Sequence, residues 1–360
     1  MVPLQKAIGR GTSENPHNRF ELLSTERDLE HLDATDAEQF AARKEPTEYY
    51  ADLTQSLVTK NDSLDIPFTY SLNPYRGCSH GCSYCYARPY HEYLGFSAGL
   101  DFETKIMVKR EAPELFRAFL RKRGWKGEVI AMSGVTDCYQ PAEREFQVTR
   151  GCLEVALEAR QPIGIITKNA LVLRDLDLLT EMARRRLVCV NLSITTLDQK
   201  LARAMEPRTS TPEARLSAVQ RLSEAGVPVN VMMAPIIPAL NDVEIPAVLK
   251  AASERGAISA GYTLLRLPHA VKEIFLSWLD EALPEHAARV RSRIEACRGG
   301  QLSDARFGSR MKGEGIIAET ISRTFSLFRT KYGLDRKHVT LDTSGFRGPS
   351  HSGKAQLRMF

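Results

Sequence analysis

The chain has 360 residues, of which 43% are hydrophobic and 26% are charged, so it can bury a large core as an ordinary globular protein does. No stretch of about 18 or more apolar residues is present, and the sequence therefore predicts no membrane span. The first residues lack the apolar segment of a signal peptide, and seven cysteines are an odd, sparse set for a disulfide framework. We therefore expect a cytoplasmic protein with reduced thiols.

The net charge of +5 is unevenly distributed along the chain. Residues 284–360 carry 15 Lys and Arg against 7 Asp and Glu, a net charge of +8, so the preceding residues sum to −3. A basic C-terminal region is typical of proteins that bind a polyanion such as nucleic acid. A solvated surface rich in arginine gives the same count, so the charge alone does not decide between the two.

Residues 1–60 are polar and mixed in charge, with glycine and proline early in the stretch. The segment 24–43 is rich in Glu, Asp and Ala but has no continuous apolar face. We predict an irregular N-terminal arm with at most one helix, packed over the main domain.

The stretch from Cys78 to Arg88 contains three cysteines, Cys78, Cys82 and Cys85, beside glycines that allow a tight loop. Three thiolates that converge on one point form a metal or iron–sulfur site. A closed zinc site or a fully ligated cluster needs four protein ligands, whereas three leave one iron open for a substrate or cofactor. Two alternatives stay open at this point: core packing, and a zinc knuckle completed by His80 or a distant residue.

The spacing CxxxCxYC resembles the cluster motif of the radical S-adenosylmethionine (SAM) enzymes. The longer run from Asn73 to Arg88 resembles the subgroup that contains spore photoproduct lyase and the DNA repair photolyase relatives. The resemblance implies that the three cysteines hold a 4Fe–4S cluster whose fourth iron binds SAM. It also implies that an electron donor such as flavodoxin or ferredoxin drives reductive cleavage of SAM to a 5′-deoxyadenosyl radical.

Six short apolar runs follow one another along the middle of the chain, with helical patterns between them. Near-continuous apolar runs are typical of strands buried on both faces of a parallel sheet. Six βα units in series predict an α/β fold, a partial (β/α)6 barrel of the TIM type, which is also the core that the resemblance implies. The predicted strands span residues 67–71, 128–132, 163–167, 188–193, 227–233 and 260–265.

Helix signals lie between and after these strands. The segment from Thr211 to Gly226 has an N-cap residue, a proline at the first helical position and a terminal glycine. Residues 171–186 place apolar side chains on one face and arginines at the C-terminal end. Amphipathic helices are predicted over residues 272–283, 286–297 and 316–332.

Active residues of such a barrel gather where strands end and loops begin. The resemblance implies that Thr136 and Ser193, after the second and fourth strands, hydrogen-bond the amino or carboxylate groups of SAM. It implies that Lys168, after the third strand, pairs with the SAM carboxylate. Ordinary capping of a strand end is the alternative for the two hydroxyls, whereas a lysine directly after a buried strand requires an anionic partner.

Three further residues are candidates at the same rim. Glu206, on the loop after the fourth strand, either meets a ribose hydroxyl of SAM or forms an exposed ion pair. Tyr84 and Tyr86 flank Cys85, and we expect one to stack on the adenine while the other packs or relays hydrogen. Both tyrosines also fit an ordinary core.

One departure from the lyase pattern concerns the hydrogen donor. The resemblance places the hydrogen-donating cysteine of the lyase at the position of Gly134, whereas Cys138 lies four residues further along. Cys138 is the candidate catalytic thiol here, and its different place puts the photoproduct reaction itself in question.

The chain is predicted to divide into an N-terminal arm (1–60), the radical SAM barrel (61–270), a helical basic extension (271–342) and a disordered tail (343–360). The extension contains a basic, glycine-bearing loop, residues 306–313, that suits contacts with phosphates.

The end of the tail resembles the bacterial sliding-clamp-binding peptide, in which Gln, Leu and a terminal aromatic residue fill apolar pockets. Met359 stands in place of the usual Leu, a nearly isosteric change. The residues concerned are Gln356, Leu357, Met359 and Phe360. The resemblance implies the clamp as a partner.

The leading hypothesis is a lyase-like radical SAM enzyme that acts on nucleic acid in DNA repair. Two alternatives stay open. One is a radical SAM enzyme that acts on a small molecule or a protein, and the other is a non-catalytic metal-binding module that binds its partner through the tail.

Overall fold

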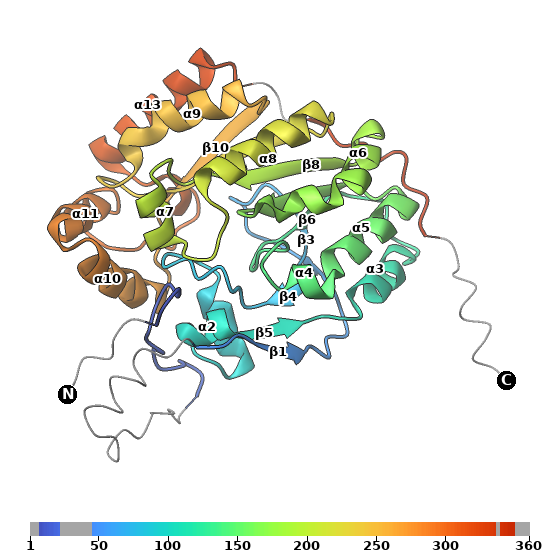
Figure 1. The fold of residues 1–360 in the computed structure, drawn as a ribbon, viewed down its shortest axis with the longest axis horizontal. Helices are drawn as coiled ribbons and strands as arrows, with labels where there is room; N and C mark the ends of the chain where they lie inside the picture. The colour runs from blue at the N-terminus through green and yellow to red at the C-terminus, as the bar shows by residue number, and fades with distance from the viewer. Residues whose placement is uncertain (1–6, 22–44, 336–338, 350–360) are drawn as a thin grey trace.

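The central element is a seven-stranded sheet with the strand order β10-β9-β8-β7-β6-β3-β2 (Figure 1). The structure, a computed structural model, describes residues 7–21, 45–335 and 339–349. Six neighbouring strands run parallel, and β2 joins the edge antiparallel to β3. The strands are β2 (Val58–Lys60), β3 (Tyr70–Leu72), β6 (Ile130–Met132), β7 (Ile163–Thr167), β8 (Val188–Ser193), β9 (Val229–Ile236) and β10 (Ser259–Leu264).

The six parallel strands are the six that the apolar runs predict, so the α/β class and the partial barrel are confirmed. Among the described residues, β10 and β2 do not pair with each other, which leaves the barrel open. The strand interiors are fully buried, for example at Ile130, Ile163, Val190 and Val229, because helices cover the outer face and the cysteine loop closes part of the inner one.

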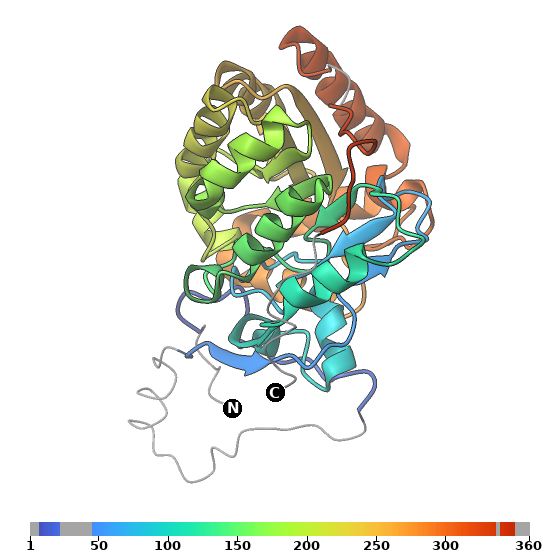
Figure 2. The ribbon, with the colours of Figure 1, turned by 90° about the vertical axis from the view of Figure 1, so that its right-hand side faces the viewer.

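Helices form a layer on one side of the sheet, as the two views show (Figures 1 and 2). The N-cap signal of Thr211 is confirmed, since its hydroxyl accepts a hydrogen bond from the Ala214 amide at 3.3 Å. The helix predicted over 171–186 divides into two, because Asn169 caps a first 3-10 turn. The elements are α3 (Ala112–Leu120), α4 (Glu143–Phe146), α5 (Val148–Ala159), η2 (Ala170–Asp175), α6 (Leu176–Arg184), α7 (Gln199–Met205), α8 (Pro212–Glu224), η3 (Asp242–Glu244) and α9 (Ile245–Glu254).

A small three-stranded sheet, which the sequence did not predict, lies beside the cysteine loop. Its order is β1 (Glu48–Ala51), β5 (Lys105–Val108) and β4 (Tyr75–Arg76). The stretch before residue 60 therefore holds two short strands, β1 and β2, rather than only irregular chain. Strands of three or four residues with mostly exposed side chains carry no readable periodicity.

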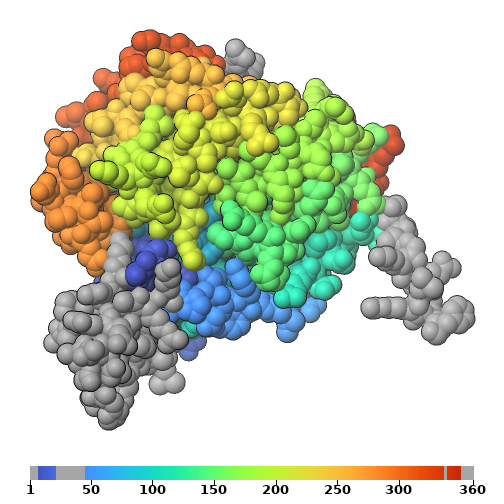
Figure 3. All heavy atoms as spheres, in the orientation of Figure 1, coloured from blue at the N-terminus to red at the C-terminus, as the bar shows by residue number. Residues whose placement is uncertain are grey.

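Residues 7–21 pack over the main domain, as expected for an N-terminal arm. In Figure 3 they lie between the orange C-terminal helices and the light-blue β1 region. The Ser277 hydroxyl on α10 (Val271–Ala282) donates to the Glu14 carboxylate at 2.9 Å, which joins the arm to the C-terminal extension. The helix expected within residues 24–43 lies outside the described residues.

The helical C-terminal extension is confirmed by α10, α11 (Pro284–Ala296), α12 (Ser309–Lys312) and α13 (Gly315–Lys331). No helix in the part of the chain that the structure describes is long and apolar enough to span a membrane. Short helices η1 (Arg88–Leu94) and α2 (Leu100–Thr104) follow the cysteine loop.

The tail from residue 343 was expected to be disordered, and residues 343–349 correct this expectation. Phe346 packs against Gly127, where a methyl group would lie only 2.4 Å from the Phe346 Cβ, and the Arg347 amide donates to the Ala159 carbonyl at 3.1 Å. One packed aromatic residue in an otherwise polar segment changes the amino-acid composition too little to predict an ordered structure. The clamp-like peptide, residues 356–360, lies outside the described residues.

Candidate functional site

The cysteine loop lies over the ends of the parallel strands and its backbone is held at several points. The Cys78 amide donates to the Phe102 carbonyl at 2.9 Å, and the Ser83 amide donates to the Met205 carbonyl at 3.0 Å. Gly81 has a φ of +69°, and a Cβ there would lie 2.4 Å from the Glu103 carboxylate. The glycine is therefore required both by the turn and by the close approach.

All three thiols of the loop are free. Cys78 and Cys82 are buried and Cys85 is half-buried, and burial raises the pKa of each thiol. In the described residues no group of three or more His, Cys, Asp or Glu side chains is arranged to hold a single metal ion. An iron–sulfur cluster spreads its cysteine ligands over different irons, so this donor set fits a cluster better than a single ion.

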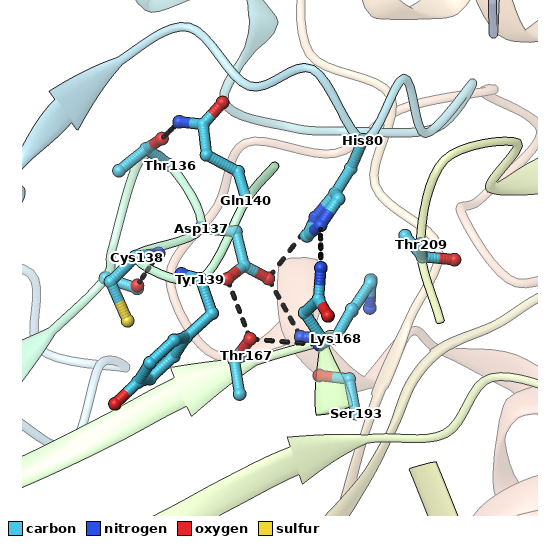
Figure 4. A network of polar contacts seen from close by, with 12 residues as sticks. His80, Thr136, Asp137, Cys138, Tyr139, Gln140, Thr167, Lys168, Ser193 and Thr209 are labelled. Carbon is cyan, nitrogen blue, oxygen red and sulfur yellow. Dashed lines mark hydrogen bonds and ion pairs between the residues drawn. The ribbon is translucent and has the colours of Figure 1, made fainter. Parts of the chain in front are cut away.

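His80 is tied to two partners, which removes it as a fourth ligand. Its Nδ1 lies 3.4 Å from Asp137 Oδ2, and its Nε2 lies 3.1 Å from Asn169 Nδ2. Because Asn169 Oδ1 accepts from the Leu171 amide, the Asn169 NH₂ group faces His80. Nε2 therefore accepts, Nδ1 carries the proton, and the imidazole has no nitrogen left for zinc (Figure 4). The zinc-knuckle alternative with His80 is not supported.

Gln140 and Thr136 brace the first half of the loop. The buried Gln140 side chain accepts from the Ser79 amide at 3.0 Å and donates to the Gly77 carbonyl at 3.2 Å. The Thr136 hydroxyl donates to the same carbonyl at 2.7 Å and accepts from Gln140 at 3.1 Å. Thr136 thus holds the cysteine loop, and its hydroxyl proton is not available to SAM.

Arg88 and Glu103 brace the second half of the loop with a fully buried ion pair at 2.5 Å. Arg88 Nη2 also donates to the Cys82 carbonyl at 2.9 Å. Glu103 accepts from the Gly11 amide at 3.0 Å, and a Cβ on Gly11 would lie 1.7 Å from the Gly81 oxygen. The N-terminal arm therefore crosses directly over the loop. Sequence reasoning assigned neither partner of this pair, although Arg88 ends the quoted motif.

Glu206 forms a buried ion pair rather than either of the contacts expected from sequence. Its carboxylate accepts from Arg215, from the Tyr84 hydroxyl and, at 2.6 Å, from the Thr195 hydroxyl. Burial alone would raise the pKa of Glu206, but Arg215 and then Lys168 outweigh it and lower the pKa to about 2. Because the Glu206 carboxylate already accepts these hydrogen bonds, no lone pair is directed at a ribose hydroxyl of SAM. Tyr84, which donates one of these hydrogen bonds, is held by the same carboxylate.

Lys168 and Ser193 lie at the ends of adjacent strands β7 and β8, as predicted (Figure 4). Lys168 Nζ donates to the Ala234 carbonyl at 2.9 Å and lies 3.9 Å from Glu206. It also lies 5.7 Å from the centre of the Tyr84 ring, beside the cysteine loop. One close acceptor leaves the ammonium group with donors for an anion. Ser193 is buried, and its carbonyl accepts from Arg215 at 3.1 Å.

Tyr86 is exposed beside the cysteine loop, whereas Cys138 is buried in the core. Tyr86 is 49% exposed and donates to the Gly134 carbonyl at 2.6 Å, so one face of its ring is open beside Cys85. Cys138 is completely buried in the core, where its thiol lies 4.0 Å from the Ile166 carbonyl. In Figure 4 the sulfur points away from Asp137. A thiol in this position cannot reach a bound substrate, so the structure does not bring Cys138 into the site.

Exposed aromatic side chains and two partly buried arginines are linked to Tyr86 by a chain of contacts. Arg266 lies 6.0 Å from the Tyr86 ring centre, and Arg310 lies 4.5 Å from that of Phe307. We call this surface the aromatic–arginine face, and it consists of Tyr86, Tyr90, Tyr93, Phe307, Arg266 and Arg310. Arg310 belongs to the basic loop predicted from sequence, whereas the tyrosines of η1 were not singled out.

Comparison with known proteins places the chain in a protein superfamily. The family model described as the Radical SAM superfamily matches residues 72–252. An uncharacterized protein of Mycobacterium tuberculosis is 38% identical over 228 residues, which cover 63% of this chain and 67% of the relative. An uncharacterized protein of Methanocaldococcus jannaschii is 34% identical over 175 residues, 49% of this chain and 63% of the relative.

Among solved structures, a mutant of spore photoproduct lyase has a TM-score of 0.55 at 14% identity, over 88% of this chain and 86% of that chain. A mutant with bound AdoMet and dinucleoside spore photoproduct has a TM-score of 0.52 at 14% identity, over 81% and 85% of the two chains. At this identity the likeness establishes a shared fold.

Proposed function

Because this chain belongs to the radical SAM superfamily, which uses a 4Fe–4S cluster and SAM, we propose that Cys78, Cys82 and Cys85 are the cluster ligands. Three free thiols on one braced loop, with His80 already engaged, fit a cluster that keeps one iron open. With cluster and SAM bound, the site supplies reductive cleavage of SAM and hydrogen abstraction from the substrate by the 5′-deoxyadenosyl radical. The residues of the chain hold the loop, orient SAM and exclude water.

Lys168 is the best-placed residue to hold the SAM carboxylate. Its ammonium group lies beside the cysteine loop and retains donors after its bond to Ala234. Ser193, buried at the end of the neighbouring strand, is retained as a second contact. Thr136 and Glu206 act through the loop, since their polar atoms are engaged by Gly77 and Arg215.

We infer that the substrate is a nucleic acid, and the aromatic–arginine face is the observation that carries this inference. Base rings stack on exposed aromatic side chains, and an arginine between them contacts a phosphate. Arg266 is the candidate for that contact, because Arg310 is paired with Asp65. Tyr86 adjoins Cys85 in sequence, so a base stacked there lies next to the cluster loop. The net charge of the C-terminal region is a weaker argument, because Arg291, Arg306 and Arg323 are paired with carboxylates.

The fold shared with spore photoproduct lyase supports a lyase-like DNA repair reaction, as a proposal that goes beyond the shared fold. The burial of Cys138 argues for a hydrogen donor other than this thiol. The Tyr86 hydroxyl donates to the Gly134 carbonyl at 2.6 Å, so we propose Tyr86 as a surface for stacking rather than as the hydrogen donor.

The test is anaerobic reconstitution with iron, sulfide, SAM and a reductant, followed by measurement of 5′-deoxyadenosine with and without damaged DNA. We expect Cys82→Ala to lose iron and 5′-deoxyadenosine formation. Cys152→Ala, in the core of α5, is the matched control that keeps both. Absence of 5′-deoxyadenosine from the wild-type protein favours the non-catalytic module, and its formation without any DNA binding at low salt favours a small-molecule or protein substrate.

A further inference from the structure

Arg266 forms no direct ion pair among the described residues, and the carboxylate that acts on it from nearby, Asp65, is paired with Arg310. Arg266 lies two residues after the end of β10, and its Nε is buried without a hydrogen bond. Its Nη1 has only the Met311 sulfur as a partner, at 3.6 Å. A thioether is a weak acceptor and provides little compensation for a partly buried cation.

Three other buried or half-buried arginines of the chain each form an ion pair with a carboxylate. Arg88 pairs with Glu103, and Arg215 pairs with Glu206. Arg310, the neighbour of Arg266 on the same surface, is bound by Asp65. Burial, and then Arg310, lower the pKa of Arg266 although Tyr86 and Asp65 oppose them, so a bound anion would stabilise the charged guanidinium.

The position of Arg266 indicates which anion that is. The guanidinium lies 6.0 Å from the Tyr86 ring, and Tyr86 is exposed and adjoins Cys85. The Nε is enclosed by the protein, so the terminal Nη groups of the guanidinium are the donors that phosphate oxygens can approach. Because the guanidinium lies over the Tyr86 ring, the base attached to that phosphate would pack against the part of the ring that stays exposed.

We propose that Arg266 binds a backbone phosphate of the nucleic-acid substrate and that the Tyr86 ring receives the adjoining base. This site rests on the proposed function and specifies how its substrate is held next to the cluster loop. The thioether of Met311 packs against the guanidinium and keeps it directed at this position.

The experiment measures binding of a fluorescent oligonucleotide to the anaerobically prepared holoenzyme over a range of salt concentrations. Arg266→Gln should bind about 10-fold more weakly at low salt, and the slope of log K against log salt should fall by about 0.7 to 0.9, the loss of one phosphate contact. Arg266→Lys should keep the slope and recover part of the affinity. Arg323→Gln is the matched control, because that side chain is 83% exposed on α13 and lies in an ordinary ion pair with Glu319.

The outcomes distinguish a failure of the Arg266 phosphate site from a failure of the proposed nucleic-acid function. A wild-type protein that fails to bind the oligonucleotide at low salt overturns the nucleic-acid substrate and the site with it. Wild-type binding that Arg266→Gln leaves unchanged in affinity and slope overturns the site alone. Iron per chain and the melting temperature are measured for every variant. If Arg266→Gln fails to fold, Arg266→Lys decides by its affinity, since weaker binding at an unchanged slope supports the phosphate contact and an unchanged affinity contradicts it.

Discussion

Replacement of Glu206 by glutamine tests whether the buried ion pair anchors the site. The change keeps the size of the side chain and removes its charge, so Arg215 is left buried without a carboxylate. The hydroxyls of Tyr84 and Thr195 lose their charged acceptor at the same time. We expect a less stable protein with a loosened second half of the cysteine loop.

The magnitude follows from the pKa of Glu206, which falls from an ordinary 4.5 to about 2. At about 1.4 kcal/mol for each unit of pKa, ionised Glu206 contributes about 3 kcal/mol to folding. This agrees with the roughly 3–5 kcal/mol lost when one partner of a buried pair is removed. Because the folded pKa is depressed, the contribution is complete above pH 4.5 and is lost as the pH falls towards 2.

The assay is urea unfolding of anaerobically prepared protein, followed by circular dichroism, with iron per chain measured in parallel. Glu206→Gln should lose about 3 kcal/mol near pH 7, and its difference from the wild type should shrink between pH 4.5 and 2. Glu213→Gln, whose side chain is 71% exposed and paired with Arg255, should change stability by less than about 0.5 kcal/mol.

A loss below about 1 kcal/mol in Glu206→Gln, or a difference that does not depend on pH, would refute the reasoning. A double variant that also carries Arg215→Met removes both charges. It should recover part of the stability lost in the single variant, because the uncompensated guanidinium is then absent.

The remaining predictions concern the loop, SAM, the buried thiol and the tail. Gln140→Ala should lower iron per chain in elemental analysis, because it frees the Gly77 carbonyl and the Ser79 amide, and equal iron content would contradict its bracing role. Lys168→Met should weaken SAM binding about 10-fold or more in calorimetry, whereas an unchanged affinity would remove it from the site. Cys138→Ala should still form product in the DNA assay, and loss of product with intact iron would restore this thiol as hydrogen donor. Deletion of 356–360 should abolish retention on an immobilised sliding clamp if the predicted peptide is used.

The sequence predicts the barrel because most positions of the central parallel strands are buried. The runs ending at Thr167 and Ser193 match the observed strands to the residue, since helices on one side and the site on the other require apolar side chains throughout. The small sheet of β1, β4 and β5 escaped prediction because its pairing depends on segments distant in sequence. Residues 343–349 are held by contacts with segments distant in sequence, Phe346 with Gly127 and Arg347 with Ala159.

The sequence identifies residues at strand ends beside the cysteine loop, and their roles toward SAM stay predictions. Thr136 and Glu206 lie near the loop, and their polar atoms are engaged by Gly77 and Arg215. Position at a strand end follows from periodicity, whereas the identity of a hydrogen-bond partner depends on a chain segment folded in from elsewhere. The partner Arg215, on α8, carries no signal in sequence beyond that of an ordinary helix residue.

The distribution of partners around the loop distinguishes structural from ligand-binding side chains. A buried loop with many peptide groups must satisfy them, and the nearest hydroxyls, amides and charges do so before any ligand arrives. Gln140, His80 and Arg88 are occupied in this way. Lys168 retains N–H donors for an anion, and Arg266 forms no ion pair with a carboxylate of the described residues. The two cations with unused donors lie on either side of the tyrosines that flank Cys85, over Tyr84 and Tyr86. The proposed contacts for SAM and for the substrate therefore adjoin the same cysteine loop, through two tyrosines that flank one of its cysteines.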